Sequence, residues 1–410
     1  MKDKFGRYGL PLKVEYCRNC TTSNQRPNTS VEFKNKPGAS KTFINFNEDG
    51  VCDACKYAGI KDQNIDWKSR EEELRELLSK HRRNDGKYDV VVPGSGGKDS
   101  IATAHLLKYK YNMNPLLVTW PPILPTEIGR RNFTAWLESG FGNYMHYPNQ
   151  KINRLLTKLS FENFLHPFQP FTIGQKNLAP KICLSYDIKL VFYGEHEAER
   201  GSPIETTQTS KRDVSSFAAD VSDLSKLFLG GVSVENLIQK YNLKPFDFEE
   251  YFPADIEKIK EKGIEFHYLG YFEKWHPQEM YYYSVENTNF MPNDYRTEGS
   301  YSKYSSLDDK IDWLHYYARY IKFGQGRATS DSSHEIRDGD ITRDEAIRLV
   351  KRFDGEFPKI YLNDCLEYMN MSEDRFNEIV DAFRPDHLWE KENGQWEFKH
   401  PIWLDSGINK

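Results

Sequence analysis

Pro93-Gly94-Ser95-Gly96-Gly97-Lys98-Asp99-Ser100 follows the apolar run Tyr88-Asp89-Val90-Val91-Val92 and precedes a helical pattern. A short glycine-rich loop therefore joins a buried strand to a helix. Glycines let the backbone approach a ligand closely, several N–H groups can converge on one oxyanion, and the helix presents its positive end to the same point. The stretch predicts a phosphate-binding loop at the carboxyl end of a strand.

Two common phosphate-binding motifs do not fit this loop. A Walker A loop needs a glycine where Val92 stands and a serine or threonine where Asp99 stands, and a dinucleotide fingerprint needs a third glycine at Asp99. A plain turn before a helix capped by Asp99 or Ser100 is the simpler alternative, but a cap needs neither three glycines nor a lysine. The form that remains is Ser-Gly-Gly-x-Asp-Ser, at residues 95–100.

The elements around the loop follow the spacing of βαβ units. The first three expected strands start about 28 residues apart, which favours a parallel sheet with the ligand at the carboxyl ends of its strands. We expect strands at 88–92, 115–120, 144–147, 189–193 and 265–271. The stretch from about 201 to 263 reads as a mostly helical insertion and is a candidate lid over the site. The predicted fold class is α/β.

Four of the six cysteines form two Cys-x-x-Cys pairs, Cys17 with Cys20 and Cys52 with Cys55, separated by 31 residues. The alternating run at 42–47 predicts a strand that leads to the second pair. Four thiolates suit a closed structural Zn²⁺ site with no position left for a reacting water. Disulfides are the alternative, which a reducing compartment disfavours.

Composition limits the class of protein. The chain has 410 residues, is 38% hydrophobic and 14% aromatic, and carries a net charge of −5, so it can bury real cores and offers no large basic surface for nucleic acid. Neither a signal peptide nor a membrane span is visible, so we expect a cytoplasmic protein. We expect three regions: a zinc ribbon at 1–66, the phosphate-loop domain at 67–271, and a mostly helical region at 272–410.

The hexapeptide at 95–100 resembles the signature of the PP-loop ATP pyrophosphatases, which adenylate a carbonyl or amide oxygen and expel pyrophosphate. The resemblance implies that the loop grips the β and γ phosphates while chemistry occurs at the α phosphorus. It assigns Lys98 and Asp99 to catalysis, with Asp99 holding Mg²⁺. The loop residues implied to bind ATP are Gly94, Ser95, Gly96, Gly97, Lys98, Asp99 and Ser100.

Further segments, together with the loop and the cysteine pairs, resemble the N-acetyl sugar amidotransferases over about residues 15–390. These segments are 166–175, 193–201, 296–304, 321–329 and 335–345. The family converts an acetamido group of a bacterial surface sugar into an acetamidino group, using ATP and Mg²⁺ and releasing AMP and pyrophosphate. The resemblance adds further ATP contacts at Thr119, Gly174, Gln175, Gly194 and Glu195.

Substrate and partner follow from the same resemblance. Lys322 and Arg327 flank two glycines and are candidate contacts for the anionic group of the sugar, against the alternative of a helix-end turn with solvated charges. Neither Cys183 nor Cys365 lies on a Gly-x-Cys-x-Gly elbow, so no glutaminase is visible in the chain. We therefore expect a separate cysteine-triad glutaminase subunit to supply ammonia.

Other readings stay open at this stage. The acceptor can be a nonulosonic acid, such as pseudaminic or legionaminic acid, or a nucleotide-linked uronic acid, and the glycan can belong to flagellin or to lipopolysaccharide. A tRNA-modifying PP-loop enzyme, either a thiolase or a lysidine-type ligase, shares the loop but needs a basic face for RNA. A zinc-ribbon adaptor without enzymatic activity would not need an intact loop.

Overall fold

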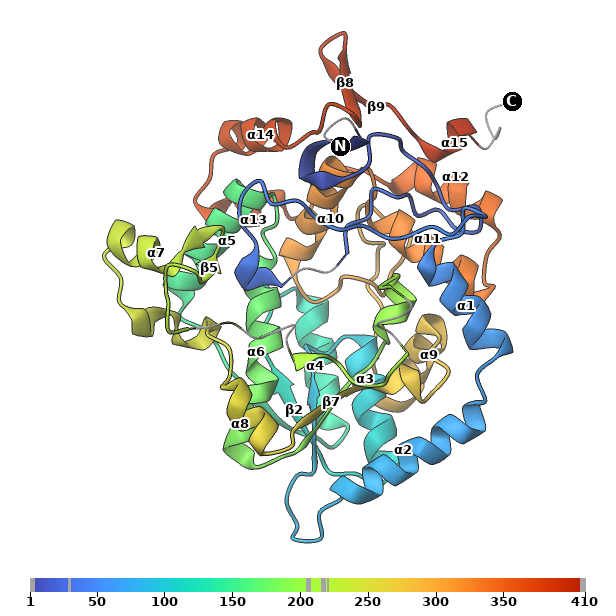
Figure 1. The fold of residues 1–410 in the computed structure, drawn as a ribbon, viewed down its shortest axis with the longest axis vertical. Helices are drawn as coiled ribbons and strands as arrows, with labels where there is room; N and C mark the ends of the chain where they lie inside the picture. Colours follow the sequence, from blue (N-terminus) through green and yellow to red (C-terminus); the bar gives the residue numbers. More distant parts are fainter. Residues whose placement is uncertain (1–3, 29–30, 204–207, 215–218, 220, 406–410) are drawn as a thin grey trace.

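A five-stranded parallel sheet forms the centre of the computed structural model, which describes residues 4–28, 31–203, 208–214, 219 and 221–405 (Figure 1). The strand order is β3-β2-β1-β4-β7, and every neighbouring pair is parallel. The strands are β1 Val90–Pro93, β2 Pro115–Thr119, β3 Gly142–Met145, β4 Leu190–Tyr193 and β7 Glu265–Tyr268. The parallel α/β sheet expected from the sequence is confirmed.

Helices cover both faces of this sheet because its strands are apolar on both sides. Val91 and Val191 point into a core with α5 (Gln150–Phe164) and α6 (Gln169–Tyr186). Val90 and Val92 point the other way, into a second core. That second core includes residues of α2 (Trp67–His81), α3 (Lys98–His105), α4 (Glu127–Glu138) and α9 (Pro277–Thr288). Strands buried on both faces read as continuous Val-rich runs, which is why the sequence reveals them clearly.

The insertion between β4 and β7 is only partly helical. It contains a short hairpin of β5 (Phe228–Leu229) and β6 (Val232–Ser233), followed by α7 (Val234–Tyr241), η8 (Pro245–Tyr251) and α8 (Ile256–Glu261). Side chains from these elements, such as Leu237 and Phe248, are buried in the same core as α5 and α6. These elements belong to the packed core in this structure, and a lid role for the insertion stays a prediction. Residues 204–207, 215–218 and 220 of the insertion lie outside the described residues.

The region after β7 is mainly helical, as expected. After α9 come α10 (Lys310–Phe323), α11 (Arg327–Asp338), α12 (Arg343–Phe353), α13 (Leu362–Met369), α14 (Glu373–Ala382) and α15 (Ile402–Asp405). Gly324, at φ +65°, ends α10 in the left-handed conformation that glycine adopts at low cost. A hairpin of β8 (Trp389–Glu392) and β9 (Gln395–Phe398), which the sequence analysis did not anticipate, follows α14.

The N-terminal segment, residues 4–28 and 31–52, lies against the C-terminal helices, where Figure 1 shows it crossing in front of α10 and α11. Thr21 Oγ1 lies 2.8 Å from Ser333 Oγ on α11, and Arg343 of α12 donates to the carbonyl oxygen of Cys17. The strand expected at 42–47 is wrong: among the described residues only single bridges form, at Phe43 and Phe46. The chain instead enters α1 (Asp53–Gln63) directly at the second cysteine pair.

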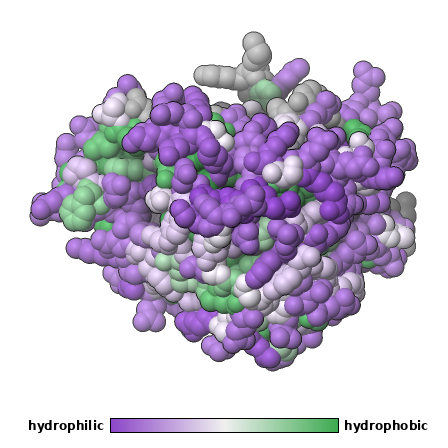
Figure 2. Space-filling view, turned by 90° about the horizontal axis from the view of Figure 1, so that it is seen from below, coloured by the Kyte–Doolittle hydropathy of each residue, from purple (hydrophilic) through white to green (hydrophobic). Residues whose placement is uncertain are grey.

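The surface opposite the N-terminal segment is largely polar. Seen from below, Figure 2 shows mainly hydrophilic residues, interrupted by separate hydrophobic patches. Among the described residues no helix has the length and apolar character needed to cross a membrane.

Candidate active site

The loop predicted from the sequence joins β1 to α3 at the carboxyl end of β1. Gly94 donates its N–H to Val118 O, and a Cβ on it would lie 2.3 Å from Ser100 Cβ. Gly96 has φ +92°, and a Cβ there would lie 2.9 Å from Phe133 Cα. The N-cap residue of α3 is Gly97, and among the described residues its N-terminus has no side-chain cap, so the N–H groups of its first turn are available to an anion.

A cavity of about 770 Å³ opens beside this loop. It lies at the carboxyl ends of β1 and β4, which are neighbours in the sheet. After β1 the chain continues to β2 on one side of this pair, and after β4 it continues to β7 on the other. Ligands of open α/β sheets bind at such a point. The sequence-predicted residues that line it are Gly94, Ser95, Gly97, Lys98, Asp99, Ser100, Gln175, Gly194, Glu195, Lys322 and Arg327. The cavity therefore brings together the loop, the segment from Gly194 to Arg200 that follows β4 (the β4 rim) and the C-terminal helices.

Three predicted ATP contacts do not belong to that lining set. Thr119 is fully buried and accepts a hydrogen bond from Asn143 Nδ2 at 2.8 Å. Gly174 packs under Trp120, since an added Cβ would lie 2.0 Å from Trp120 Cε2. Gly96 shapes the loop through its backbone. The structure explains the first two residues by packing, and their assignment to ATP stays a prediction.

Lys98 and Asp99 form an ion pair at the start of α3. Lys98 Nζ lies 2.9 and 2.7 Å from the two carboxylate oxygens of Asp99, and Trp275 Nε1 donates to the same carboxylate at 3.3 Å. Ser95 Oγ donates to Asp308, a half-buried carboxyl whose pKa is raised by desolvation. Asp308 was missed by the sequence analysis, because nothing local links the segment before α10 to the loop.

A carboxylate and an imidazole face each other at the β4 rim. Arg200 Nε donates to Glu195 and keeps the pKa of that carboxyl below its usual range, although burial alone would raise it. His334 Nδ1 of α11 lies 3.5 Å from the other oxygen of Glu195. Burial, with Arg337 and Arg200 nearby, lowers the pKa of His334 well below its ordinary value. His334 is therefore a neutral base at neutral pH.

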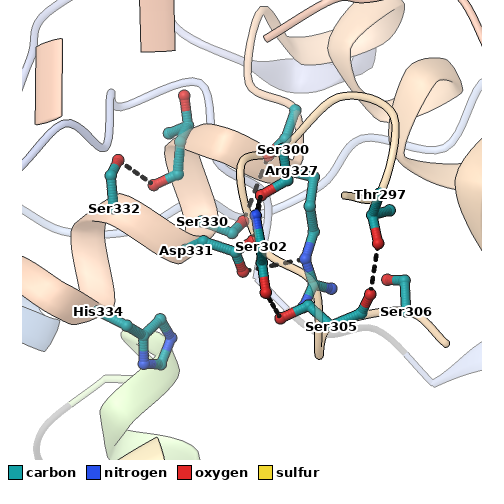
Figure 3. A network of polar contacts seen from close by, with 12 residues as sticks. Thr297, Ser300, Ser302, Ser305, Ser306, Arg327, Ser330, Asp331, Ser332 and His334 are labelled. Atoms are coloured by element: carbon teal, nitrogen blue, oxygen red, sulfur yellow. Dashed lines mark hydrogen bonds and ion pairs between the residues drawn. The ribbon is translucent and has the colours of Figure 1, made fainter. Parts of the chain in front are cut away.

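A serine-rich loop at residues 297–306 packs over the N-terminal end of α11 (Figure 3). Ser300 Oγ donates to Asp331 at 2.6 Å, and Asp331 also pairs with Arg327 Nε at 3.0 Å. The guanidinium of Arg327 lies over the Tyr316 ring, 4.5 Å from its centroid. In Figure 3 the ring of His334 points away from this loop. Arg327 thus lines the cavity as a paired cation.

Lys322 lines another part of the cavity and is nearly buried, with 8% of its surface exposed. Its Nζ donates to Phe164 O at 2.8 Å. Burial and the nearby Lys41 lower the pKa of Lys322 to about 7. The glycine-flanked loop expected around it is instead the end of α10 and the start of α11.

The lowered pKa of Lys322 predicts a pH dependence of stability. The unfolded chain holds this proton up to about pH 10.5, whereas the folded chain releases it near pH 7. Between these values the unfolded state binds more protons, so folding gains stability as pH rises, and the cost of the buried charge is fully present below pH 7. Lys322→Met should therefore gain most stability over wild type at pH 6 and least near pH 10, as measured by urea unfolding. A difference that is constant across pH would contradict this prediction.

The four paired cysteines meet in one buried cluster. Their sulfur atoms all lie within 4.8 Å of one another, with Cys17 to Cys55 at 3.9 Å and Cys20 to Cys52 at 3.7 Å. Four thiolates placed tetrahedrally at about 2.3 Å around Zn²⁺ would be separated by about 3.8 Å. The backbone N–H of Cys52 points to Cys17 Sγ at 3.3 Å, the kind of outer contact that orients a thiolate ligand. The cluster fits a zinc site with four cysteine ligands.

Part of the chain matches a protein-family model, and other known proteins show weaker likenesses to it. Residues 298–402 match the family model described as "LPS biosynthesis protein WbpG-like, C-terminal domain". This region contains Lys322, Arg327 and His334 and so supplies one wall of the cavity. An uncharacterized protein of Methanocaldococcus jannaschii is 32% identical over 83 residues, which are 19% of this chain and 28% of that relative. The chain thus spans little more than a quarter of that protein's length.

Among solved structures, the NMN synthetase from Francisella tularensis is 14% identical to this chain. The superposition covers 49% of this chain and 94% of the synthetase, with a TM-score of 0.19.

Proposed function

We propose, from the premise that this chain belongs to the WbpG-like family, that it is an ATP-dependent N-acetyl sugar amidotransferase of surface polysaccharide biosynthesis. In this proposal it turns the acetamido group of a bacterial sugar into an acetamidino group and releases AMP and pyrophosphate. The observation that carries the proposal is a single cavity lined both by the Ser-Gly-Gly-Lys-Asp-Ser loop and by the WbpG-like helices. The loop supports binding of a nucleotide, and the helices support binding of a sugar.

The loop supports a grip on the pyrophosphate part of ATP. Uncapped N–H groups of α3 and the ammonium of Lys98 would face the β and γ phosphates, with Ser95 and Ser100 as further hydrogen-bond donors. Asp99 has the carboxylate oxygens that Mg²⁺ prefers, and the ion would offset charge on the phosphates. Gln175, Gly194 and Glu195 extend the proposed ATP site along the cavity wall.

The chemistry needs activation because an acetamide oxygen is a poor leaving group. Attack of this oxygen on the α phosphorus forms a new O–P bond and breaks the bond to pyrophosphate. Ammonia then adds to the imidate carbon, one N–H proton leaves, and the C–O bond to AMP breaks. We assign the proton to His334, because its imidazole lines the cavity and Glu195, 3.5 Å from its Nδ1, can orient the ring.

This assignment predicts a split between the two half-reactions. His334→Gln should lower acetamidino formation by about 100-fold, the scale of a lost general base, and leave exchange of labelled pyrophosphate into ATP close to wild type. Parallel loss of both half-reactions would instead mean that His334 only shapes the site. His81→Gln, on α2 and outside the residues that line the cavity, is the matched control.

Ammonia would come from a second protein. Cys183 and Cys365 are buried, and burial raises the pKa of both thiols, so neither resembles an activated nucleophile. We propose a cysteine-triad glutaminase subunit as the source. We also propose a cytoplasmic location, where ATP and sugar precursors occur, and a structural role for Zn²⁺ at the cysteine cluster. The boundaries 1–66, 67–271 and 272–410 stay our proposed division into domains.

The products of the reaction test the proposed function. The purified chain, given ATP, Mg²⁺, ammonium and a panel of diacetamido sugars, should release AMP and pyrophosphate and lower the sugar mass by about one unit, since NH replaces O. Glutamine should not replace ammonium. Release of ADP and orthophosphate would refute the proposal, and AMP formation that depends on tRNA would favour the tRNA-modifying alternative.

A further inference from the structure

Five cations from three separate parts of the chain line the same cavity. Arg26 and Lys41 come from the N-terminal segment, Lys176 from α6, and Arg319 and Lys322 from α10. None of them belongs to the phosphate loop or the β4 rim. We call this group the cation cluster.

Two members of the cation cluster contact no partner among the described residues. Within residues 4–28, 31–203, 208–214, 219 and 221–405, the side chains of Arg26 and Lys176 make no hydrogen bond, ion pair or ring contact. Arg319 donates only to the hydroxyl of Ser330, at 2.8 Å, and its guanidinium lies near the Tyr316 ring. The Nζ of Lys322 donates a hydrogen bond to the backbone carbonyl oxygen of Phe164. The charges of these four residues are thus not matched by carboxylates in direct contact.

The cluster members also repel one another. Burial and the nearby Arg319 lower the pKa of Arg26 to about 9, and burial with Arg212 lowers that of Lys176. Burial is also the main cause that lowers the pKa of Arg319. Glu32 and Glu197 favour the charge of Lys176 without contacting it. Glu32 accepts a hydrogen bond from Gln169 Nε2 at 3.0 Å, and Glu197 lies 3.9 Å from Arg212.

Other titratable groups near the cluster are either neutral or bonded elsewhere. Asp331 and Asp354 favour the charge of Arg319 from a distance, but Asp331 is paired with Arg327. His166 and His315 line the cavity with their Nδ1 atoms 3.2 Å apart, and burial keeps both neutral. Asp354, near Arg319, accepts from the backbone N–H groups of Gly326 and Thr329. Holding several desolvated like charges together costs stability unless an anion completes the arrangement, and such costs concentrate at functional sites.

We infer that Arg26, Lys41, Lys176, Arg319 and Lys322 form an anion subsite that binds an acidic oxygen group of the acceptor, beside the ATP site. This inference rests on the proposed function for the identity of the acceptor. The shared chemistry is a carboxylate or a diphosphate, both of which match the planar donor sets of two arginines. The N-terminal segment, which the sequence assigned only to zinc, thereby contributes directly to substrate binding.

Isothermal titration of the full-length, zinc-loaded chain tests the subsite. The phosphate loop is first occupied with α,β-methylene ATP and Mg²⁺, so that added anions cannot bind there. Uridine diphosphate and N-acetylneuraminic acid are then titrated separately, with neutral N-acetylglucosamine as the charge control. We expect one anionic probe to bind and the neutral sugar not to bind. The anion that binds identifies the acidic group as a diphosphate or a carboxylate.

Variants locate the binding. Arg26→Gln and Lys176→Gln should each weaken the bound probe by roughly 10- to 100-fold, the scale of one charged hydrogen bond, with the affinity for the ATP analogue unchanged. Lys80→Gln, an exposed residue of α2, makes the same charge change and should have no effect. Arg26→Lys and Lys176→Arg keep the charge and should retain most of the binding.

Thermal unfolding separates a binding role from a structural one. Because Arg26 and Lys176 have no partners, their glutamine variants should melt at or above the wild-type temperature, whereas structural residues would lower it. The inference is overturned if neither anion binds, or if binding survives both glutamine variants. Failure of the proposed function would look different: anion binding would persist in a chain that forms no AMP from any sugar.

Discussion

Lys98→Met is expected to lower AMP formation by about 100- to 1,000-fold, the loss measured when a single preorganised electrostatic group is removed from an active site. Within the described residues the ammonium of Lys98 bonds only to the adjacent Asp99, so its removal should leave the fold intact. The rate is measured by chromatography of AMP in the presence of sugar and ammonium. Melting temperature and zinc content should match those of wild type.

Two further variants serve as controls for the effect of Lys98→Met. Lys80→Met removes an exposed lysine of α2 and should keep the wild-type rate, while Lys98→Arg keeps the positive charge and should recover part of the activity. If Lys98→Met formed AMP at the wild-type rate, the proposed grip of the loop on pyrophosphate would be wrong.

Cys52→Ser is expected to reduce bound zinc from about one ion per chain to nearly none. Binding of structural Zn²⁺ by four cysteines is worth about 10–16 kcal/mol, comparable to the stability of a whole domain. The apolar cluster around these cysteines is small, so the N-terminal segment should lose its order without the metal. Arg26 and Lys41 would then no longer be held at the cavity wall.

The proposed ATP site should survive this change. The loop and α3 pack in a separate core with α2 and α9, so binding of an ATP analogue should persist while turnover of the sugar is lost. Zinc is measured by atomic emission and nucleotide binding by titration. Cys183→Ala, a buried cysteine outside the cluster, should keep both zinc and activity. Full turnover by zinc-free chain would show that the N-terminal segment holds its place without the metal.

The sequence predicts the sheet well because its signals are local. Val90 to Val92 form a continuous apolar run, and the glycines that follow have a required backbone geometry, so strand, loop and helix can each be recognised within about fifteen residues. Thr342 and Glu345 form a capping box at the start of α12, and this pattern too lies within four consecutive residues. The spacing of the paired cysteines alone also predicts their cluster.

The rest of the site is made by contacts between distant segments. His334 meets Glu195 across 139 positions of the chain, and Asp308 meets Ser95 across 213. Arg26 stands in a stretch without a motif and carries no sign of its position at the cavity. At 42–47 alternation suggested a strand, but single bridges and the entry to α1 replaced it. Whether such a segment forms a strand depends on the segments it pairs with, and a single sequence does not reveal these partners.

The N-terminal segment packs against α11 and α12, and this contact has a consequence for folding during synthesis of the chain. Thr21 and Ser333 touch although 312 positions separate them, so this contact cannot form until the ribosome has released most of the polypeptide. A nascent chain can complete strands β1 to β4 and their helices much earlier. The part of the cavity proposed to bind the nucleotide would then exist before the part proposed to bind the sugar, and a truncated translation product would carry the first without the second.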